Sequence, residues 1–343
     1  MEYVVNKTQQ EQFIATYNSD TARRHARYAL NWFEYWIKSN GAIFSQITQD
    51  NIYHVLQGFV KFLEGKKAIN EDCKIKIYDP GTIADEFANV TVKAYMSYLR
   101  TYLAHLGIKT DDREYRRLVR LQKPLRELKY TPDLTMVQRV TYGIMPKYQN
   151  YLVLLLATGA RQSEAIQLKV EDVDLSQTPA SVHFPAQITK TRTERYSFLT
   201  KEAAGLIKNQ IAGKQPGDLI FSELNLASFR MVWRNLRQRL GFEARYATGV
   251  HKLTPHRLRA YSNRIMQRES GDAFADVILG HADGLQSYDV GSLEAMRADY
   301  AKAEPMLTIS PELRKFSQQN TNNRMQAEID RLKFEIERLK TVV

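Results

Sequence analysis

A run of seven apolar residues, Tyr151–Ala157, constrains the fold of this chain more than any other feature. An uncharged stretch that is apolar all round is typical of a helix buried inside a domain. Thr158 and Gly159 end the run with a turn signal, and Arg161 follows directly. The pattern predicts a buried helix with an arginine just beyond its end, and a new helix over Glu164–Leu168.

The composition favours a nucleic-acid partner. The chain has 49 lysines and arginines against 38 aspartates and glutamates, a net charge of +11, and its pI is about 9.5. Such a balance suggests a polyanionic partner, DNA or RNA first, although a merely basic housekeeping protein has it too. The single cysteine, Cys73, allows neither a disulfide framework nor a cysteine zinc site, which fits a reducing interior.

The sequence carries no sign of a membrane. No run approaches the roughly 18 apolar residues of a spanning helix. The first seven residues, Met1–Lys7, lack the basic start and apolar core of a signal peptide. We therefore expect a cytoplasmic protein without a membrane partner.

A length of 343 residues predicts two domains and a tail. Apolar residues recur at helical spacing in three stretches before residue 120, which predicts a small helical bundle. Charges and two prolines then mark a linker, followed by a helix from about Thr135. The helical stretches are Glu11–Trp36, Asn51–Leu63 and Val90–Leu106; the predicted parts are residues 1–122, the linker 123–133, the second domain 134–309 and the tail 310–343.

The second domain is predicted to combine helices with a small antiparallel sheet. Two short segments rich in β-branched or aromatic residues, Val182–Ile188 and Arg195–Leu199, flank a polar turn and read as strands. Thr200 is expected to cap the next helix, and Leu226–Leu240 reads as a basic amphipathic helix. The fold class is therefore mainly α with a small antiparallel β-sheet.

Three short motifs bring together groups that suit chemistry on a phosphodiester. Arg161 offers a guanidinium that can fork onto a phosphate, unless a salt bridge to Glu164 is its whole role. We expect Glu164 to orient the arginine. His256 and Arg259 are three residues apart, so they face the same side of one helix, which begins after Pro255. His281 lies in Leu-Gly-His, where the glycine allows a tight turn.

Lys190 lies at the tip of the predicted hairpin. An ammonium on a loop can reach a duplex and protonate a departing 5′ oxygen, as a general acid does. Arg192 is the alternative for this role. The histidines could instead bind a metal, but no Cys, His or carboxylate cluster has ligand spacing, so we expect no metal and no cofactor.

These motifs in this order resemble the catalytic domain of the tyrosine recombinase (phage integrase) family. The resemblance rests on Thr158–Glu164, Thr254–Arg259 and Leu279–His281 and covers roughly residues 134–307. It implies a site-specific recombinase or integrase that cuts double-stranded DNA through a 3′-phosphotyrosyl link without metal or ATP. It implies further that the N-terminal helical domain clamps the duplex, that His281 binds the phosphate, and that four protomers exchange strands through a four-way junction.

Two tyrosines are candidates for the nucleophile. Tyr288 follows His281 by seven residues, about two fewer than is usual in the family, and we favour it. Tyr300 follows by nineteen residues in an apparent amphipathic helix, where it could equally be a packing residue. In either case Arg161, Arg259 and His256 have to favour the phenolate or accept its proton.

Exposed basic residues are the candidate DNA contacts outside these motifs, although a solvated helix face explains each almost as well. The candidates are Arg23, Arg24, Arg27, Arg192, Arg230, Arg234 and Arg237.

Other classes of function remain open from the sequence. A type IB topoisomerase or a telomere resolvase would use nearly the same groups, and a non-catalytic DNA-binding protein would need only the basic residues. The tail spaces its apolar residues by 4, 3, 4, 3, 4, a heptad seam suited to pairing between protomers or to docking on its own domain. The seam residues are Met325, Ile329, Leu332, Ile336, Leu339 and Val343.

Overall fold

The computed structural model describes most of the chain and divides it into two compact units. The units are Met1–Glu127 with Tyr246–Val250, and Leu128–Arg245 with His251–Val343. The described residues are 7–39, 47–65, 87–123, 127–281, 292–315, 319, 326 and 329–333. The domain limits given above stay a prediction.

The first unit consists of helices around an aromatic core. α2 packs mainly against α4, which also contacts α3. Trp32 and Phe33 of α2 are buried, and the ring of Phe33 lies 5.0 Å from that of Phe59. These aromatics therefore hold the bundle together, as predicted for residues 10–120. The helices are α1 (Lys7–Ala15), α2 (Asp20–Ser39), α3 (Ile52–Gly65), α4 (Asn89–His105) and α5 (Asp112–Leu118).

The helical stretch Glu11–Trp36 contains parts of two helices, because the structure breaks it between Ala15 and Asp20. The hydroxyl of Ser19 accepts the backbone N–H of Ala22 at 3.1 Å, so a new N-terminal cap competes with helix continuation.

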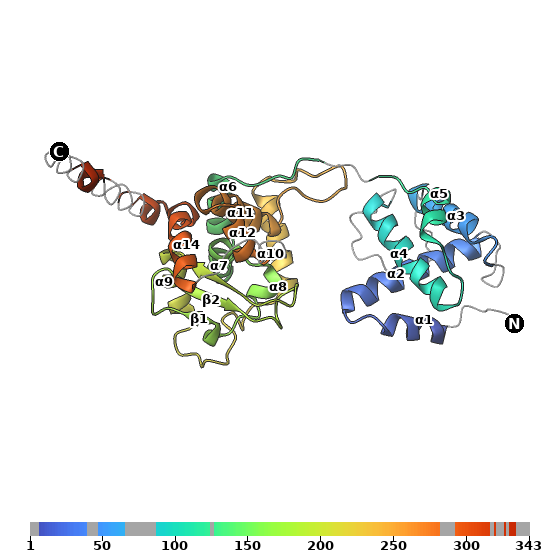
Figure 1. The fold of residues 1–343 in the computed structure, drawn as a ribbon, viewed down its shortest axis with the longest axis horizontal. Helices are drawn as coiled ribbons and strands as arrows, with labels where there is room; N and C mark the ends of the chain where they lie inside the picture. Colours follow the sequence, from blue (N-terminus) through green and yellow to red (C-terminus); the bar gives the residue numbers. More distant parts are fainter. Residues whose placement is uncertain are drawn as a thin grey trace, which may run out of the picture. The chain divides into compact units, whose positions relative to one another are not determined.

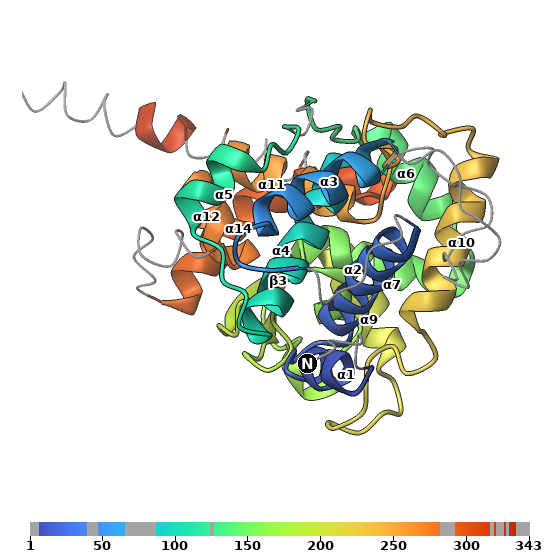
Figure 2. The ribbon, with the colours of Figure 1, turned by 90° about the vertical axis from the view of Figure 1, so that its right-hand side faces the viewer.

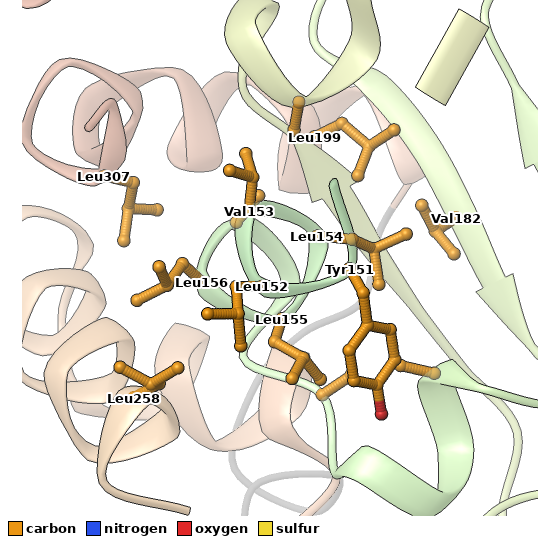
Figure 3. Packing of buried hydrophobic residues seen from close by; sticks show 14 of the residues in the cluster. Tyr151, Leu152, Val153, Leu154, Leu155, Leu156, Val182, Leu199, Leu258 and Leu307 are labelled. Carbon is orange, nitrogen blue, oxygen red and sulfur yellow. The ribbon is translucent and has the colours of Figure 1, made fainter. Parts of the chain in front are cut away.

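The second unit is built around α7. Its residues Tyr151–Thr158 are all buried. Leu199 and Val182 of the strands lie on one side of α7, and Leu258 and Leu307 lie on another (Figure 3). The predicted buried helix is confirmed and forms the centre of this core. The helices are α6 (Leu134–Gly143), η2 (Pro146–Tyr148), α7 (Gln149–Thr158), α8 (Gln162–Ala165), η3 (Val170–Asp172), α9 (Lys201–Gln210), α10 (Leu226–Arg239), α11 (His256–Ser270), α12 (Asp272–Leu279) and α14 (Leu293–Leu307) (Figure 1).

A three-stranded antiparallel sheet of order β1-β2-β3 completes this unit, with β1 Val173–Asp174, β2 Ala180–Phe184 and β3 Arg195–Leu199. The predicted strand Val182–Ile188 is wrong at both ends, because pairing runs only from Ala180 opposite Leu199 to Phe184 opposite Arg195. Pro185 has no N–H to donate to the ladder, so the strand ends before it. The fold class, mainly α with a small antiparallel sheet, is confirmed.

Helix boundaries follow local capping. The side chain of Asp133 accepts the N–H of Met136 and begins α6 at Leu134. The hydroxyl of Thr200 accepts the N–H of Ala203 at 3.1 Å, as predicted. Among the described residues no helix is long and apolar enough to cross a membrane.

Most of the predicted heptad tail lies outside the described residues. Ile329 and Leu332 are described, in a helical segment, and they are 46% and 49% exposed. Docking of these two side chains in their own domain is therefore not observed, and pairing between protomers stays a prediction.

Candidate active site

The first part of the site is the turn between α7 and α8. Gly159 ends α7 in the left-handed region (φ 62°), and a Cβ there would lie 2.5 Å from a side-chain carbon of Leu279. Only glycine meets both requirements. The turn places Arg161 at the start of α8, where its Nη1 donates to Glu164 Oε1 at 2.8 Å. The predicted salt bridge therefore exists, and about a fifth of the Arg161 side chain remains exposed.

Glu164 is the hub of the site. Its carboxylate is wholly buried and pairs with both Arg161 and Arg195, whose Nη2 donates at 2.7 Å. The backbone N–H of Lys190 lies 3.4 Å from Glu164 Oε1. Burial by itself raises the pKa of Glu164, but the charge of Arg195 and the hydrogen bonds from Arg161 outweigh it and lower the pKa. The carboxylate therefore stays ionised and orients two cations.

Arg195 was predicted only as the first residue of a strand. Its guanidinium is buried, donates through Nε to Ile278 O at 3.0 Å, and lies 4.1 Å from the ring centroid of Phe184. A Cβ at Gly280 would approach its Cδ to 3.0 Å. Arg195 thus ties the hairpin to the end of α12, which carries His281. No spacing rule in the sequence signals this contact, because the partners are far apart along the chain.

Arg259 joins the remaining segments. Its Nη1 donates to Gly159 O at 2.6 Å and its Nη2 to Leu279 O at 2.7 Å. Burial, together with the charges of Arg161 and Arg195, lowers the pKa of Arg259 to about 9, which leaves it protonated at neutral pH. Arg161 and Arg195 pair with the same carboxylate, and Arg259 bonds to Gly159, two residues before Arg161, so the three cations lie around one locus.

His256 is the first residue of α11, close to Arg259 and Arg161, and its side chain is only partly exposed. Partial burial and the positive charges of Arg259 and Arg257 lower the pKa of His256. The ring is therefore neutral at neutral pH and able to accept a proton.

His281 follows the left-handed Gly280 (φ 68°) at the end of α12. Its Nε2 lies 3.3 Å from Arg259 Nη2, and its Nδ1 lies 2.8 Å from Asp276 Oδ1. The sequence analysis did not select Asp276 as a site residue. It lies five residues before His281, close enough along the chain to contact it at the end of α12. α11 (Figure 2) packs against α12. This packing brings Arg259 into contact with His281.

The loop of residues 185–194 carries the predicted acid. Lys190 is exposed, and its backbone is held close to Glu164. Thr189 stabilises the loop by donating its hydroxyl to Thr193 O at 2.9 Å. Arg192, the alternative, is exposed and adopts φ 57°, an uncommon value for a residue with a side chain.

The two tyrosine candidates differ sharply. Tyr288 lies outside the described residues. Tyr300 is fully buried in α14, where its hydroxyl donates to Ala157 O at 2.9 Å and its ring lies 5.4 Å from that of Phe198. Burial raises the pKa of Tyr300 well above its usual value. This is the environment of a packing residue, and a phosphate cannot reach the hydroxyl without opening α14.

Several predicted DNA contacts have intramolecular partners. Arg27 pairs with Glu11 at 2.8 Å, and Arg23 pairs with Asp20 at 3.2 Å. Arg24 is exposed. Arg237 is buried and pairs with Glu243 at 3.2 Å, so its selection as a surface contact is wrong. Arg230 and Arg234 are exposed on α10.

The first unit also has a basic pocket that the sequence did not single out. The pocket has a volume of about 580 Å³, and its wall includes Lys93, Arg100 and Lys109. Arg100 is fixed by Thr110 and Asp112 at 2.9 and 2.7 Å. Lys93 and Lys109 are exposed.

Two arginines and two histidines around one locus, on a mainly helical domain with a small sheet, are typical of enzymes that act on phosphodiesters. Residues 137–286 match the model of the phage integrase family. This part of the second unit is therefore similar to the tyrosine recombinases, a family of enzymes that break and rejoin DNA.

The similar proteins carry related names. A probable integrase/recombinase of Acholeplasma phage L2 is 24% identical over 62% of this chain and 76% of its own length. Tyrosine recombinase XerA of Saccharolobus solfataricus is 26% identical over 63% of this chain and 68% of its own. A solved lambda integrase tetramer bound to a Holliday junction has the same fold, with 15% identity over 83% of this chain and 79% of that chain and a TM-score of 0.53.

Proposed function

We propose that this protein is a site-specific DNA recombinase that cuts one strand through a 3′-phosphotyrosyl link and rejoins it to a partner strand. The observation that carries the proposal is the convergence of Arg161, Arg259 and His281 from three distant segments. Arg161 pairs with Glu164, while Arg259 donates to Gly159 O, two residues before Arg161, and contacts His281. Guanidiniums fixed in this way stabilise the charge of a pentavalent phosphorus centre.

The reaction consists of two transfers at phosphorus. The phenol oxygen of Tyr288 attacks the scissile phosphorus and the bond to the 5′ oxygen breaks. His256, neutral at neutral pH, accepts the phenol proton, and Lys190 donates a proton to the departing oxygen. A 5′ hydroxyl of the partner strand then attacks the phosphotyrosyl link and releases the tyrosine. The phosphodiester energy is kept in the covalent link, so ATP is not needed, and the arginines supply the positive charge.

Replacing Lys190 by alanine is expected to slow covalent adduct formation about a hundredfold or more, because the leaving oxygen loses its acid. In a substrate with sulfur in place of the bridging 5′ oxygen, the sulfur departs as a thiolate and needs no proton. This substrate should therefore restore most of the rate of Lys190→Ala. The measurement is the single-turnover rate on both substrates. Arg192→Ala is the matched control; if that variant shows the defect and the rescue instead, Arg192 is the acid.

We propose that the basic pocket of the first unit contacts DNA phosphates. Lys93 and Lys109 are exposed on its wall, whereas Arg23 and Arg27 already pair with acids. Alanine at both lysines is expected to weaken binding to any duplex and to reduce the slope of log affinity against log salt by about 2. Alanine at Lys61 and Lys208, two exposed lysines outside the pocket, is the control. Equal slopes for the two double variants would refute the assignment.

We further propose that the active assembly is a homotetramer on two duplexes in the cytoplasm. The solved lambda integrase tetramer on a Holliday junction supports the assembly, and the net charge of +11 supports DNA as the partner. The heptad tail is proposed to add contacts between protomers.

A trapping experiment tests the function. DNA that stays attached to the denatured protein is first sequenced to find the site. A nicked duplex carrying that site is then mixed with the protein in EDTA, and a covalent adduct is expected. Adduct formation and relaxation on plasmids that lack the site would support a topoisomerase, and DNA binding without any adduct would support a non-catalytic DNA-binding protein.

A further inference from the structure

Asp276 makes a contact with His281 that the reaction described above does not use. Asp276 lies in the last turns of α12, and its Oδ1 is 2.8 Å from His281 Nδ1. A separate backbone bond of 2.9 Å joins His281 N to Asp276 O. The backbone bond closes the end of the helix by itself, so the carboxylate is not required to form the turn.

The contacts of His281 define which ring nitrogen carries the proton. A guanidinium only donates hydrogen bonds, and an ionised carboxylate only accepts them. Because Arg259 Nη2 lies 3.3 Å from His281 Nε2, that nitrogen has to accept. Nδ1 therefore carries the hydrogen and donates it to Asp276. The lone pair of Nε2 is then directed at Arg259.

This arrangement is unsuited to holding a phosphate. A non-bridging oxygen that accepts a hydrogen bond from Arg259 Nη2 also lies near His281 Nε2. A lone pair on Nε2 repels such an oxygen, whereas an N–H at Nε2 donates to it. His281 therefore has to take up a second proton when the phosphate binds.

We propose that Asp276 is a positioning residue that allows His281 to act as a cationic donor to the scissile phosphate. His281 keeps its proton on Nδ1, gains one from solvent on Nε2, and becomes an imidazolium whose charge is balanced by the Asp276 carboxylate. No other covalent bond changes in this step, and the hydrogen bond from Arg259 Nη2 to Nε2 is released. The same hydrogen bond fixes the orientation of the ring from the side away from the phosphate, as carboxylates bonded to metal-binding histidines do in other proteins.

The inference rests on the proposed function, but its first test does not involve DNA. In full-length protein with 15N-labelled histidine, the nitrogen shifts of His281, assigned with His281→Gln, report the protonated nitrogen. We expect the proton on Nδ1 in the wild type. A proton on Nε2 would overturn the assignment, whether or not the protein cleaves DNA.

The second test is a double-mutant cycle on the rate of adduct formation at saturating DNA. Asp276→Asn keeps the size of the side chain and an oxygen acceptor for Nδ1 but removes the charge. It is expected to slow the rate about tenfold or more in the wild type and to have no further effect in His281→Gln. Asp276→Glu should recover part of the rate, since it restores the carboxylate.

Asp272→Asn is the matched control, because it removes the same charge from an exposed position at the other end of α12. It is expected to leave the rate unchanged. If Asp276→Asn reduces the rate of adduct formation equally in the wild type and in His281→Gln, Asp276 acts through the fold. That result would overturn the proposal, and so would an unchanged rate in Asp276→Asn. If the wild-type protein forms no adduct, the proposed function is wrong. The nitrogen shifts of His281 would then still test which ring nitrogen carries the proton.

Discussion

Glutamine in place of Arg259 is expected to reduce the rate of covalent adduct formation by about a thousandfold or more. The guanidinium is buried, is fixed by Gly159 O and Leu279 O, and is next to His281. Its remaining N–H groups can fork onto a phosphate, and losing even one such donor costs roughly a hundredfold to a thousandfold. Lysine keeps the charge without the planar fork, so Arg259→Lys should stay well below the wild type.

The measurement for Arg259 is the single-turnover rate of cleavage of a duplex that carries the site found in the trapping experiment. Arg268→Gln is the control: Arg268 is an exposed arginine of α11 that pairs with Glu269 at 2.7 Å, and we expect wild-type cleavage from this variant. Cleavage by Arg259→Gln at more than a tenth of the wild-type rate would show that this guanidinium does not stabilise the reacting phosphate.

Replacing Glu164 by glutamine is expected to destabilise the second unit by about 3–5 kcal/mol, because a buried cation loses its counter-charge. The Arg195 side chain is 2% exposed and the Glu164 side chain 0% exposed at their 2.7 Å contact. Adduct formation should fall as well, since Arg161 loses the group that orients it. Thermal unfolding measures the first effect and trapping the second.

Glu171→Gln is the matched control for Glu164. Glu171 pairs with Lys169 at 3.3 Å, but both side chains are about half exposed. Surface pairs contribute at most about 1 kcal/mol, so this variant should unfold close to the wild type. Similar shifts for Glu164→Gln and Glu171→Gln would contradict the role of Glu164 as the hub.

The same carboxylate gives stability a pH dependence of known sign. Folding lowers the pKa of Glu164 below its ordinary value of 4.5, so the ionised group stabilises the folded state above that pH. The stabilisation is lost as the pH falls through the folded-state pKa. Acidification below about pH 4.5 should therefore narrow the difference in stability between the wild type and Glu164→Gln.

The sequence predicted the parts of the fold that depend on local chemistry. The apolar run of α7 and the cap at Thr200 follow from neighbouring residues, and the structure confirms them. The break between α1 and α2 escaped prediction, because a cap at Ser19 competes with an amphipathic pattern that continues across it. The end of β2 was not predicted correctly either, because apolar and β-branched residues continue beyond Pro185 although the strand ends before it.

The site was predictable where a motif is contiguous. Spacing alone placed His256 and Arg259 on one helix. It did not reveal that Arg195 pairs with Glu164, because the two residues are 31 positions apart and meet only through the fold. It did not reveal that the Arg237 side chain is buried, because its partner Glu243 lies beyond the helix end.

The most direct test of the central claim is the identity of the residue that joins the DNA. The adduct formed in EDTA is digested with protease and nuclease, and the modified peptide is sequenced by mass spectrometry. We expect a nucleotide on Tyr288, joined through its 3′ phosphate, and no adduct from Tyr288→Phe. A nucleotide on Tyr300 or on a serine, or an undiminished adduct from Tyr288→Phe, would contradict the account.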